Sequence, residues 1–223
     1  MPLAKPSDPV YHDRERRGER VLFIFYANID SVPDSPDGLP LSSYRLEKLV
    51  SCRSAQRRRQ SIGAELLLIH ALRVVSPDLL PPLSIAAEPD GKPCLNDFDL
   101  HFSLSHSGSF AACALSDHPV GLDLEKRGRM RESLLRRSFS PEEQTLIRSS
   151  QDSDLLFTRI WTGKESYVKA TGQGILSPLR EIQPLNPPAG VSFWHKDLES
   201  FCLSVCVLGF SAEPDRCEQI NLP

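Results

Sequence analysis

Two acidic residues in one short apolar segment could do chemistry together. Asp123 and Glu125 stand two positions apart in Val120-Gly-Leu-Asp-Leu-Glu125. Side chains of a strand alternate between its faces, so both carboxylates would point one way and Leu122 and Leu124 the other, into a core. Neighbouring carboxylates repel each other and lose hydration, and a hard divalent cation is a common compensation. Solvated acids at a strand edge are the alternative that this spacing leaves open.

A third acid and a histidine lie in two further segments that could bind a metal or an anion. Glu165 belongs to Trp161-Thr-Gly-Lys-Glu-Ser-Tyr-Val-Lys169, where a helix would place Lys169 on the same face. An ordinary surface ion pair of about 0.3–0.5 kcal/mol is the simpler interpretation. His106 lies in Ser105-His-Ser-Gly108, whose small residues would let a phosphate reach backbone donors. Single histidines are usually structural. Each of the two segments is therefore weak evidence for a binding site when taken alone.

The surrounding patterns predict the elements that would hold these residues. Ser105–Gly108 is expected to be a turn, Ser140-Pro-Glu-Glu143 the start of a helix, and Gly172 and Gly174 the end of another. Strands are expected at 21–26, 101–105, 110–115, 120–125, 191–194 and 201–208, and helices within 42–75, from 140, and at 155–170.

The order of strand, helices and strands occurs twice in these expected elements. This repetition predicts an α/β (α+β) fold, a pseudo-two-fold chain of two similar α/β halves. We expect a flexible tail at 1–19, an N-terminal half at 20–119, and a C-terminal half at 120–223 that carries the metal site. No direct sequence repeat accompanies this pattern.

Composition and charge narrow the class of protein. The 223 residues are 40% hydrophobic and 25% charged, as in an ordinary globular protein, and a net charge of -3 gives no reason to expect nucleic acid binding. No apolar run approaches the roughly 20 residues that span a bilayer, so we expect no membrane insertion and no export signal. The six cysteines form no C-x-x-C pair, and Cys113, Cys202 and Cys206 lie in apolar runs. A reduced, cytoplasmic protein is therefore expected.

Taken together and in order, these segments resemble the surfactin-type 4′-phosphopantetheinyl transferases. The strand with its two acids, followed by the tryptophan–Lys-Glu-Ser helix, is a specific combination. The resemblance covers residues 91–176 and is carried by Gly91-Lys-Pro93, Phe102-Ser-Leu-Ser-His-Ser-Gly108, Pro119-Val-Gly-Leu-Asp-Leu-Glu125, Trp161–Lys169, Gly172 and Gly174.

The resemblance implies an activity and a metal site. It implies transfer of 4′-phosphopantetheine from coenzyme A to a serine of an acyl or peptidyl carrier protein, with adenosine 3′,5′-bisphosphate as the other product. The fold would hold coenzyme A, the substrate, between its two halves. Asp123, Glu125 and Glu165 match the ligands of Mg²⁺, and Mn²⁺ accepts the same oxygen donors.

The resemblance also implies roles for further residues. Glu143, with Glu142 beside it, falls at the place of a general base, and Glu165 is the alternative base. Contacts with coenzyme A are implied as follows: Ser105 and His106 at the 3′-phosphate, Lys92 at the nucleotide, Lys164 and Lys169 at the diphosphate and pantetheine arm, and Lys48 and Arg59 at a phosphate. Lys169 would also add positive charge during the reaction.

A basic cluster follows the acidic strand and gives a candidate surface for the partner. Carrier proteins of this kind are generally acidic, so we expect them to meet this cluster, which comprises Arg127, Arg129, Arg131, Arg136 and Arg137. A chain of two halves can close its own active site, and we therefore expect a monomer.

Two other functions use the same residues. A metal-dependent phosphatase or nucleotidyl hydrolase would use the acids with water as nucleophile, without needing the Gly-Lys-Pro and Ser-His-Ser segments. A binding protein that kept only the nucleotide pocket has no reason to retain Asp123, Glu125, Glu165 and Lys169 together. The serines at 103, 105 and 107 lack the G-x-S-x-G pattern of a hydrolase nucleophile.

Overall fold

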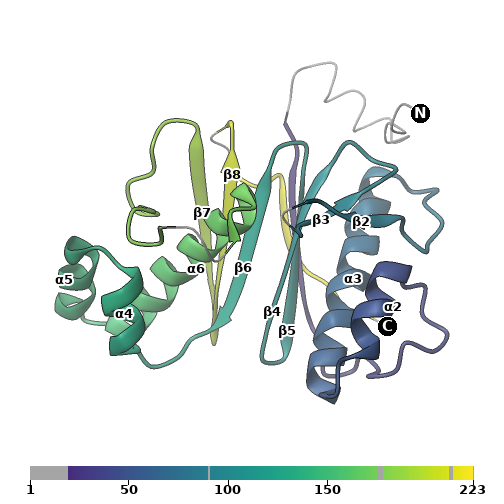
Figure 1. The fold of residues 1–223 in the computed structure, drawn as a ribbon, viewed down its shortest axis with the longest axis horizontal. Coiled ribbons are helices and arrows are strands. Elements are labelled where there is room, and N and C mark those ends of the chain that lie inside the picture. Colours follow the sequence, from purple (N-terminus) through teal and green to yellow (C-terminus); the bar gives the residue numbers. More distant parts are fainter. Residues whose placement is uncertain (1–19, 90, 175–177, 211–212, 223) are drawn as a thin grey trace.

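The chain forms a mixed α/β fold, with helices outside and strands in the middle (Figure 1). The structure is a computed structural model that describes residues 20–89, 91–174, 178–210 and 213–222, so the expected tail at 1–19 lies outside the described residues. The elements are β1 (Leu22–Asn28), α2 (Ser43–Val50), α3 (Ala55–Val75), β2 (Ile85–Ala87), β3 (Pro93–Leu95), β4 (His101–Ser107), β5 (Phe110–Ser116), β6 (Val120–Lys126), α4 (Glu132–Ser138), α5 (Pro141–Ser149), α6 (Ser153–Thr171), β7 (Val191–Leu198), β8 (Phe201–Leu208) and β9 (Arg216–Gln219).

The two main sheets share one topology. One sheet has the strand order β4-β5-β1-β9 and the other β6-β8-β7, while β2 and β3 form a small ribbon. In each sheet the first strand along the chain, β1 or β6, pairs antiparallel with β5 or β8, and that strand then pairs antiparallel with β4 or β7. This shared order supports our proposal that the chain divides into similar halves near residue 120.

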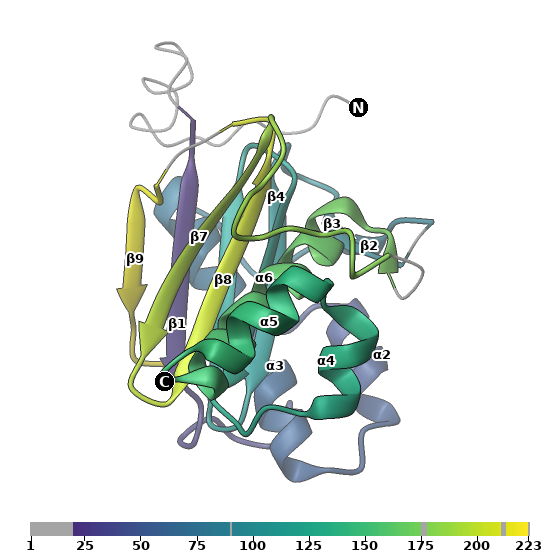
Figure 2. The ribbon, with the colours of Figure 1, turned by 90° about the vertical axis from the view of Figure 1, so that its left-hand side faces the viewer.

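The sheets face each other across a common apolar core. Ile24 of β1 and Ala112 of β5 meet Leu122 of β6 and Val205 of β8 there, and all four are fully buried. Leu124 joins this core as well, so the predicted inward direction of Leu122 and Leu124 is confirmed. Helix α3 covers the outer face of the first sheet and α6 that of the second, and the strands run in similar directions in the turned view (Figure 2).

Serine and glycine set several helix ends as the sequence predicts. Ser42 and Ser54 accept hydrogen bonds from the third residues of α2 and α3, and Ser140 forms a capping box with Glu143 at the start of α5. Helix α6 ends at Gly172, whose φ of 70° is the left-handed conformation that glycine adopts without strain.

One local expectation was wrong, and one strand had not been predicted. The segment Ser105–Gly108 is not all turn, because β4 continues to Ser107 and His106 pairs with Ala111 of β5. The segment after residue 211 had no predicted element, and the structure forms β9 there, paired parallel with β1. The residues Arg216–Gln219 are half-buried or exposed and lack the apolar alternation that would have indicated a strand.

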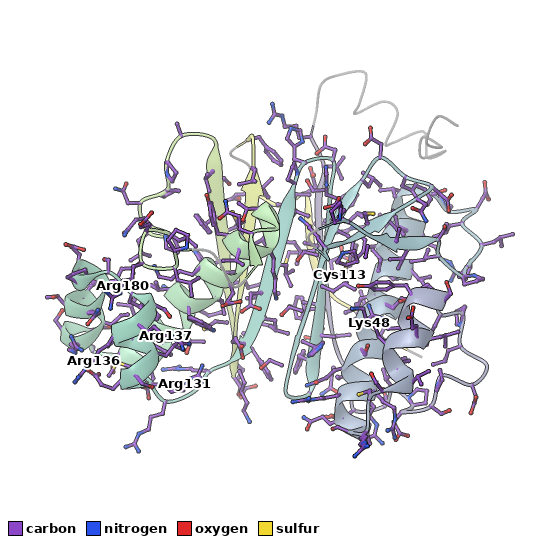
Figure 3. The ribbon with its side chains drawn as sticks, in the orientation of Figure 1. Lys48, Cys113, Arg131, Arg136, Arg137 and Arg180 are labelled. Atoms are coloured by element: carbon purple, nitrogen blue, oxygen red, sulfur yellow. The ribbon has the colours of Figure 1, made fainter. Side chains whose placement is uncertain are left out.

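The cysteines are free thiols within the folded part. Cys113, Cys202 and Cys206 are buried, as their apolar context predicts, and Cys113 lies in the middle of the fold (Figure 3). Burial raises the pKa of Cys202 and Cys206 to about 12, so these thiols stay protonated and unreactive. Within the described ranges, no helix combines the length and apolar composition that crossing a membrane requires.

Gly121 allows β6 and α6 to approach closely. A Cβ atom on this residue would lie 1.9 Å from the carbonyl oxygen of Ser166 and 2.3 Å from the amide nitrogen of Ala170. Both are backbone atoms of α6, so only glycine permits this separation of strand and helix. The contact brings α6, with Glu165 and Lys169, against the strand that carries Asp123.

Candidate active site

Two adjoining cavities lie along α6. Both include Val168 and Gly174, so they meet on one side of this helix. The larger, of about 740 Å³, is lined by Arg137, Trp161, Glu165, Leu179 and Arg180 among others. The smaller, of about 400 Å³, is lined by Tyr44, Lys48, Lys92, His106 and Lys169 among others, from both halves of the chain. Volumes of this size suit small-molecule ligands.

Three carboxylates on β6 and α6 influence one another, and one of them, Glu165, lines the larger cavity. Asp123 is buried on β6, Glu125 follows it on the same face, and Glu165 is half-buried on α6. Burial raises the pKa of Glu125, and the negative charge of Asp123 raises it further. The same two causes, in the same order, raise the pKa of Glu165. The structure thus gathers acids 40 residues apart in the chain into one region of negative potential.

Lys169 partly compensates this charge. Its Nζ atom lies 2.6 Å from Oδ1 of Asp123 and donates to the carbonyl oxygen of Leu122 at 3.0 Å. The other oxygen of Asp123, Oδ2, is buried and has no hydrogen-bond partner among the described residues. An unpaired buried carboxylate oxygen is costly, and a bound cation is one means of satisfying it.

The acids do not form a complete metal-binding cluster by themselves. Within the described part of the chain, no three His, Cys, Asp or Glu side chains are placed to share one ion. Mg²⁺ is usually held by one or two carboxylates together with phosphate oxygens and water, so a protein site of this kind need not be complete. The donor type and the unpaired oxygen of Asp123 fit a hard divalent cation.

Basic and polar groups line the smaller cavity. His106 projects from β4, and the removal of its ring from water, then the charge of Lys169, lower its pKa. Lys92 donates to the carbonyl oxygens of Val120 and Ala170, which places it between β6 and the end of α6. Lys48 lies on α2, with its Nζ 4.8 Å from the ring centre of Tyr44. The structure therefore brings three expected contact residues, His106, Lys92 and Lys48, to one cavity.

Helix α2 is fixed in place beside this cavity by a buried acid. Glu65 of α3 is fully buried. Its carboxylate accepts hydrogen bonds from the amide and the hydroxyl of Ser42 and forms an ion pair with Arg45. The Nε atom of Arg45 lies 3.0 Å from Oε2 of Glu65. This contact commits Arg45 to holding α2 and leaves Lys48 as the lysine that α2 contributes to the cavity lining.

Comparison with known proteins gives a family for this arrangement. Residues 119–213 match the model of the 4′-phosphopantetheinyl transferase superfamily. The chain is 41% identical over 94 residues to the 4′-phosphopantetheinyl transferase gsp of Aneurinibacillus migulanus, and 28% identical over 214 residues to a 4′-phosphopantetheinyl transferase of Bacillus subtilis. It is 30% identical over 164 residues to a protein of Haemophilus influenzae named as a putative 4′-phosphopantetheinyl transferase.

These alignments cover 41%, 82% and 69% of this chain, and 39%, 92% and 69% of the three relatives respectively. The chain belongs to the 4′-phosphopantetheinyl transferase superfamily. Transferases of this family move phosphopantetheine from coenzyme A to carrier proteins. The resemblance seen in the sequence motifs is confirmed, and so is the α+β class of the fold.

The structure of this 4′-phosphopantetheinyl transferase places two expected site residues elsewhere. Lys164 is fully buried and donates to the carbonyl oxygens of Leu179 and Ile182, and its Nζ lies 2.8 Å from Oε2 of Glu143. Glu143 is also buried and accepts from the amide of Ser140. These contacts argue against a diphosphate contact for Lys164 and against Glu143 as general base. On α6, Lys164 projects away from the face that carries Glu165 and Lys169.

The Glu143–Lys164 pair instead ties the loop that lines the larger cavity to α5 and α6. Lys164→Met should lower the free energy of unfolding by about 3 kcal/mol, because it leaves the buried carboxylate of Glu143 unpaired. Urea unfolding measures the change. The double variant Lys164→Met/Glu143→Gln should recover part of the loss, since the uncompensated charge is gone. Equal stability of the single and double variants would contradict this account.

Two further expected contacts in this transferase also differ. Ser105 is buried, and its hydroxyl already donates to Asp123 and accepts from the amide of Leu124 and from Lys169. One donor and two acceptors are the full capacity of a hydroxyl, so it has none left for the expected 3′-phosphate. Arg59 lies near the start of α3, within electrostatic range of Asp34, and not among the residues lining the smaller cavity. Several basic residues lie close together in this part of the sequence, so the sequence did not show which of them reaches the cavity.

Sequence reasoning missed the use made of Ser103 and Ser107. It set them aside as hydrolase candidates without giving them another role. Their spacing with Ser105, at every second position of a strand, is a detectable signal of one polar face. It also missed Arg180, which lines the larger cavity and donates to the carbonyl oxygen of Arg137 at 3.1 Å.

Proposed function

We propose that this chain transfers 4′-phosphopantetheine from coenzyme A to a serine of an acyl or peptidyl carrier protein. The observation that carries the proposal is the meeting of two cavities along α6. Glu165, Arg137 and Arg180 line the larger. The smaller is basic, and its Lys169 pairs with Asp123. The serine hydroxyl attacks the β-phosphorus, and the bond from this phosphorus to the bridging oxygen breaks. Adenosine 3′,5′-bisphosphate leaves, and the serine proton goes to a base.

The smaller cavity is the proposed site for the nucleotide end of coenzyme A. His106, Lys92 and Lys48 would supply the donors and positive charge that phosphates require. They come from three separate segments of the first half, and Lys169 comes from the second half, so together they would hold the nucleotide between the halves. Ser105 and Arg59 are not part of this proposal, because their contacts lie elsewhere.

The acids are the proposed ligands of Mg²⁺, or of Mn²⁺ in its place. Asp123, Glu125 and Glu165 supply oxygen donors of the right kind, and Oδ2 of Asp123 lacks any other partner. When bound, the ion would neutralise charge on the diphosphate. The unfavourable clustering of three carboxylates is explained if their natural state includes a cation.

The chain's own residues account for charge and proton transfer at the diphosphate. Lys169 is held at Asp123 by an ion pair and can add positive charge beside the reacting phosphate. Glu165 lines the larger cavity, and its raised pKa suits a group that accepts a proton from the incoming serine. Glu143 is not part of this proposal, because its carboxylate is buried and paired with Lys164.

The carrier protein would approach over α4. Arg131, Arg136, Arg137 and Arg180 gather on this side of the molecule, and Lys48 lies across the strands from them (Figure 3). Arg137 and Arg180 line the larger cavity together with Glu165. An acidic helical partner would therefore find positive charge beside the entrance that its serine must reach.

Charge reversal of this surface should weaken carrier use alone. The variant Arg136→Glu/Arg137→Glu should raise KM for the carrier about tenfold, because attraction becomes repulsion at the rim of the cavity. Initial rates at varied carrier concentration measure this. The dissociation constant for coenzyme A should not change, and Arg73→Glu, on exposed α3 surface, is the control. Unchanged carrier kinetics would refute the docking surface.

The decisive experiment for the activity is a loading assay. The protein is incubated with coenzyme A, Mg²⁺ and each of a panel of apo carrier proteins, and the carriers are weighed by mass spectrometry. A carrier that gains the mass of one phosphopantetheine supports the transfer. Hydrolysis of coenzyme A with no carrier modified would support the metal-dependent phosphatase or nucleotidyl hydrolase instead. The panel also identifies the carrier.

We further propose that the chain acts as a cytoplasmic monomer, without nucleic acid or membrane as partner. Both halves contribute to the smaller cavity, so a second copy is not needed to complete it. The cysteines are free, which agrees with a reducing compartment. Light scattering of the purified protein at micromolar concentration tests the monomer.

A further inference from the structure

A row of serine side chains joins the two halves of the fold. Strand β6 is the edge of its sheet, and β4 is the edge of the other (Figure 1). The backbone amides of Leu122, Leu124 and Lys126 donate to Oγ of Ser103, Ser105 and Ser107 at 2.9, 3.1 and 2.9 Å. The backbone amides of an edge strand normally need a neighbouring strand or water as hydrogen-bond acceptor. Here three serine hydroxyls are the acceptors. We call Ser103, Ser105 and Ser107 the serine row.

Two members of the serine row also hold the acids. Ser105 donates to Oδ1 of Asp123 at 3.0 Å, and Ser107 donates to Oε2 of Glu125 at 3.0 Å. Each hydroxyl thus connects the backbone of β6 to a carboxylate of the same strand. Ser103 bonds the backbone of Leu122 in the same way and bonds no carboxylate among the described residues.

This geometry restricts the direction of each carboxylate. A carboxylate on an edge strand normally samples several rotamers, because water satisfies each of them equally. A hydroxyl fixed at the backbone selects the rotamer that meets it and leaves the other oxygen for a different partner. For Asp123 that other oxygen, Oδ2, is the one that is buried and unpaired.

We propose that Ser105 and Ser107 are positioning residues that set the directions of the Asp123 and Glu125 carboxylates for a divalent cation. The inference rests on the proposed function, because it takes these acids as cation ligands. The serine row comes from the first half and the acids from the second, so the docking of the halves prepares the site. Ser107 is the better residue to test, since Ser105 also contacts Lys169.

The test compares Ser107→Ala with Ser103→Ala, its matched control. Each removes one hydroxyl that bonds a β6 amide, but only Ser107→Ala frees a carboxylate. Mn²⁺ binding is measured by electron paramagnetic resonance at saturating coenzyme A, because Ser103 also lines the smaller cavity. Thermal unfolding is measured alongside. We expect Ser107→Ala to bind Mn²⁺ about tenfold more weakly. Ser103→Ala should lose at least as much thermal stability, because the amide that it leaves unpaired is buried. It should still bind Mn²⁺ within about twofold of the unaltered protein.

A third variant and the unaltered protein make the outcomes distinct. Ser107→Thr keeps the hydroxyl and should restore Mn²⁺ affinity. Equal affinity in Ser107→Ala and the unaltered chain would overturn the inference, as would equal weakening by Ser103→Ala, which would make the serine row purely structural. An unaltered protein that binds coenzyme A but no Mn²⁺ would overturn the proposed cation as well, and this failure appears without any substitution.

Discussion

Gly121→Ala is expected to destabilise the fold of this transferase strongly. The added Cβ would lie 1.9 Å from the carbonyl oxygen of Ser166 and 2.3 Å from the amide nitrogen of Ala170. Overpacking against side chains costs about 1–3 kcal/mol, but these are backbone atoms of α6 that cannot rotate away. The strand and helix must separate, so we expect a loss above this range and a thermal midpoint at least about 10 °C lower.

The matched control for this substitution is Gly128→Ala. An alanine there would place its Cβ 3.7 Å from the carbonyl oxygen of Lys126, which is an ordinary contact, and the φ angle of Gly128 is not positive. Its midpoint should stay within about 3 °C of the unaltered protein, corresponding to a change of about 1 kcal/mol. Circular dichroism melting measures both variants. A normal midpoint for Gly121→Ala would show that α6 lies farther from β6 than described.

Asp123→Asn is expected to abolish most transfer while leaving the fold intact. Asparagine keeps an oxygen that can accept from Ser105 and Lys169, and it removes one of three mutually repelling charges. The cation and the diphosphate would lose their most buried carboxylate, so we expect kcat to fall at least about 100-fold. Carrier loading followed by mass spectrometry measures the rate, and melting measures the fold.

Two comparisons make the Asp123→Asn result specific. Asp78→Asn, at an exposed acid outside both sheets, should retain full transfer and stability. The midpoint of Asp123→Asn should lie within a few degrees of the unaltered protein, which separates loss of chemistry from loss of structure. Full transfer by Asp123→Asn in the presence of Mg²⁺ would mean that the acids do not hold the cation.

Much of this fold could be predicted because its signals are local. The alternation in Val120–Glu125 determines which side chains face the core, and burial of Leu122 and Leu124 follows from it. Helix ends at Ser42, Ser140 and Gly172 depend on hydrogen bonds and dihedral angles of the residues themselves. Such features need no knowledge of distant contacts.

The errors concern side chains whose direction depends on tertiary packing. Glu143 and Lys164 are charged residues in a motif beside the acids, and nothing in their spacing showed that they pair with each other inside the protein. Ser105 has the composition of a phosphate-binding turn, yet β4 extends through it and turns its hydroxyl toward β6. The hydroxyl of Ser105 points toward β6 because β6 is the edge of a second sheet. Sequence spacing carries no information about where that edge lies.

Strand β9 connects the end of the chain to the sheet of the first half. Its residues follow the second half in sequence, yet they complete the sheet of the first half beside β1, with the pairing of Phe23 and Arg216 at one end. A fragment ending near residue 119 would therefore leave the edge of β1 open to pairing with other chains, which favours aggregation. Attempts to study the halves as separate polypeptides would need residues 213–222 supplied with the first, and an affinity tag fused behind them would sit next to that sheet.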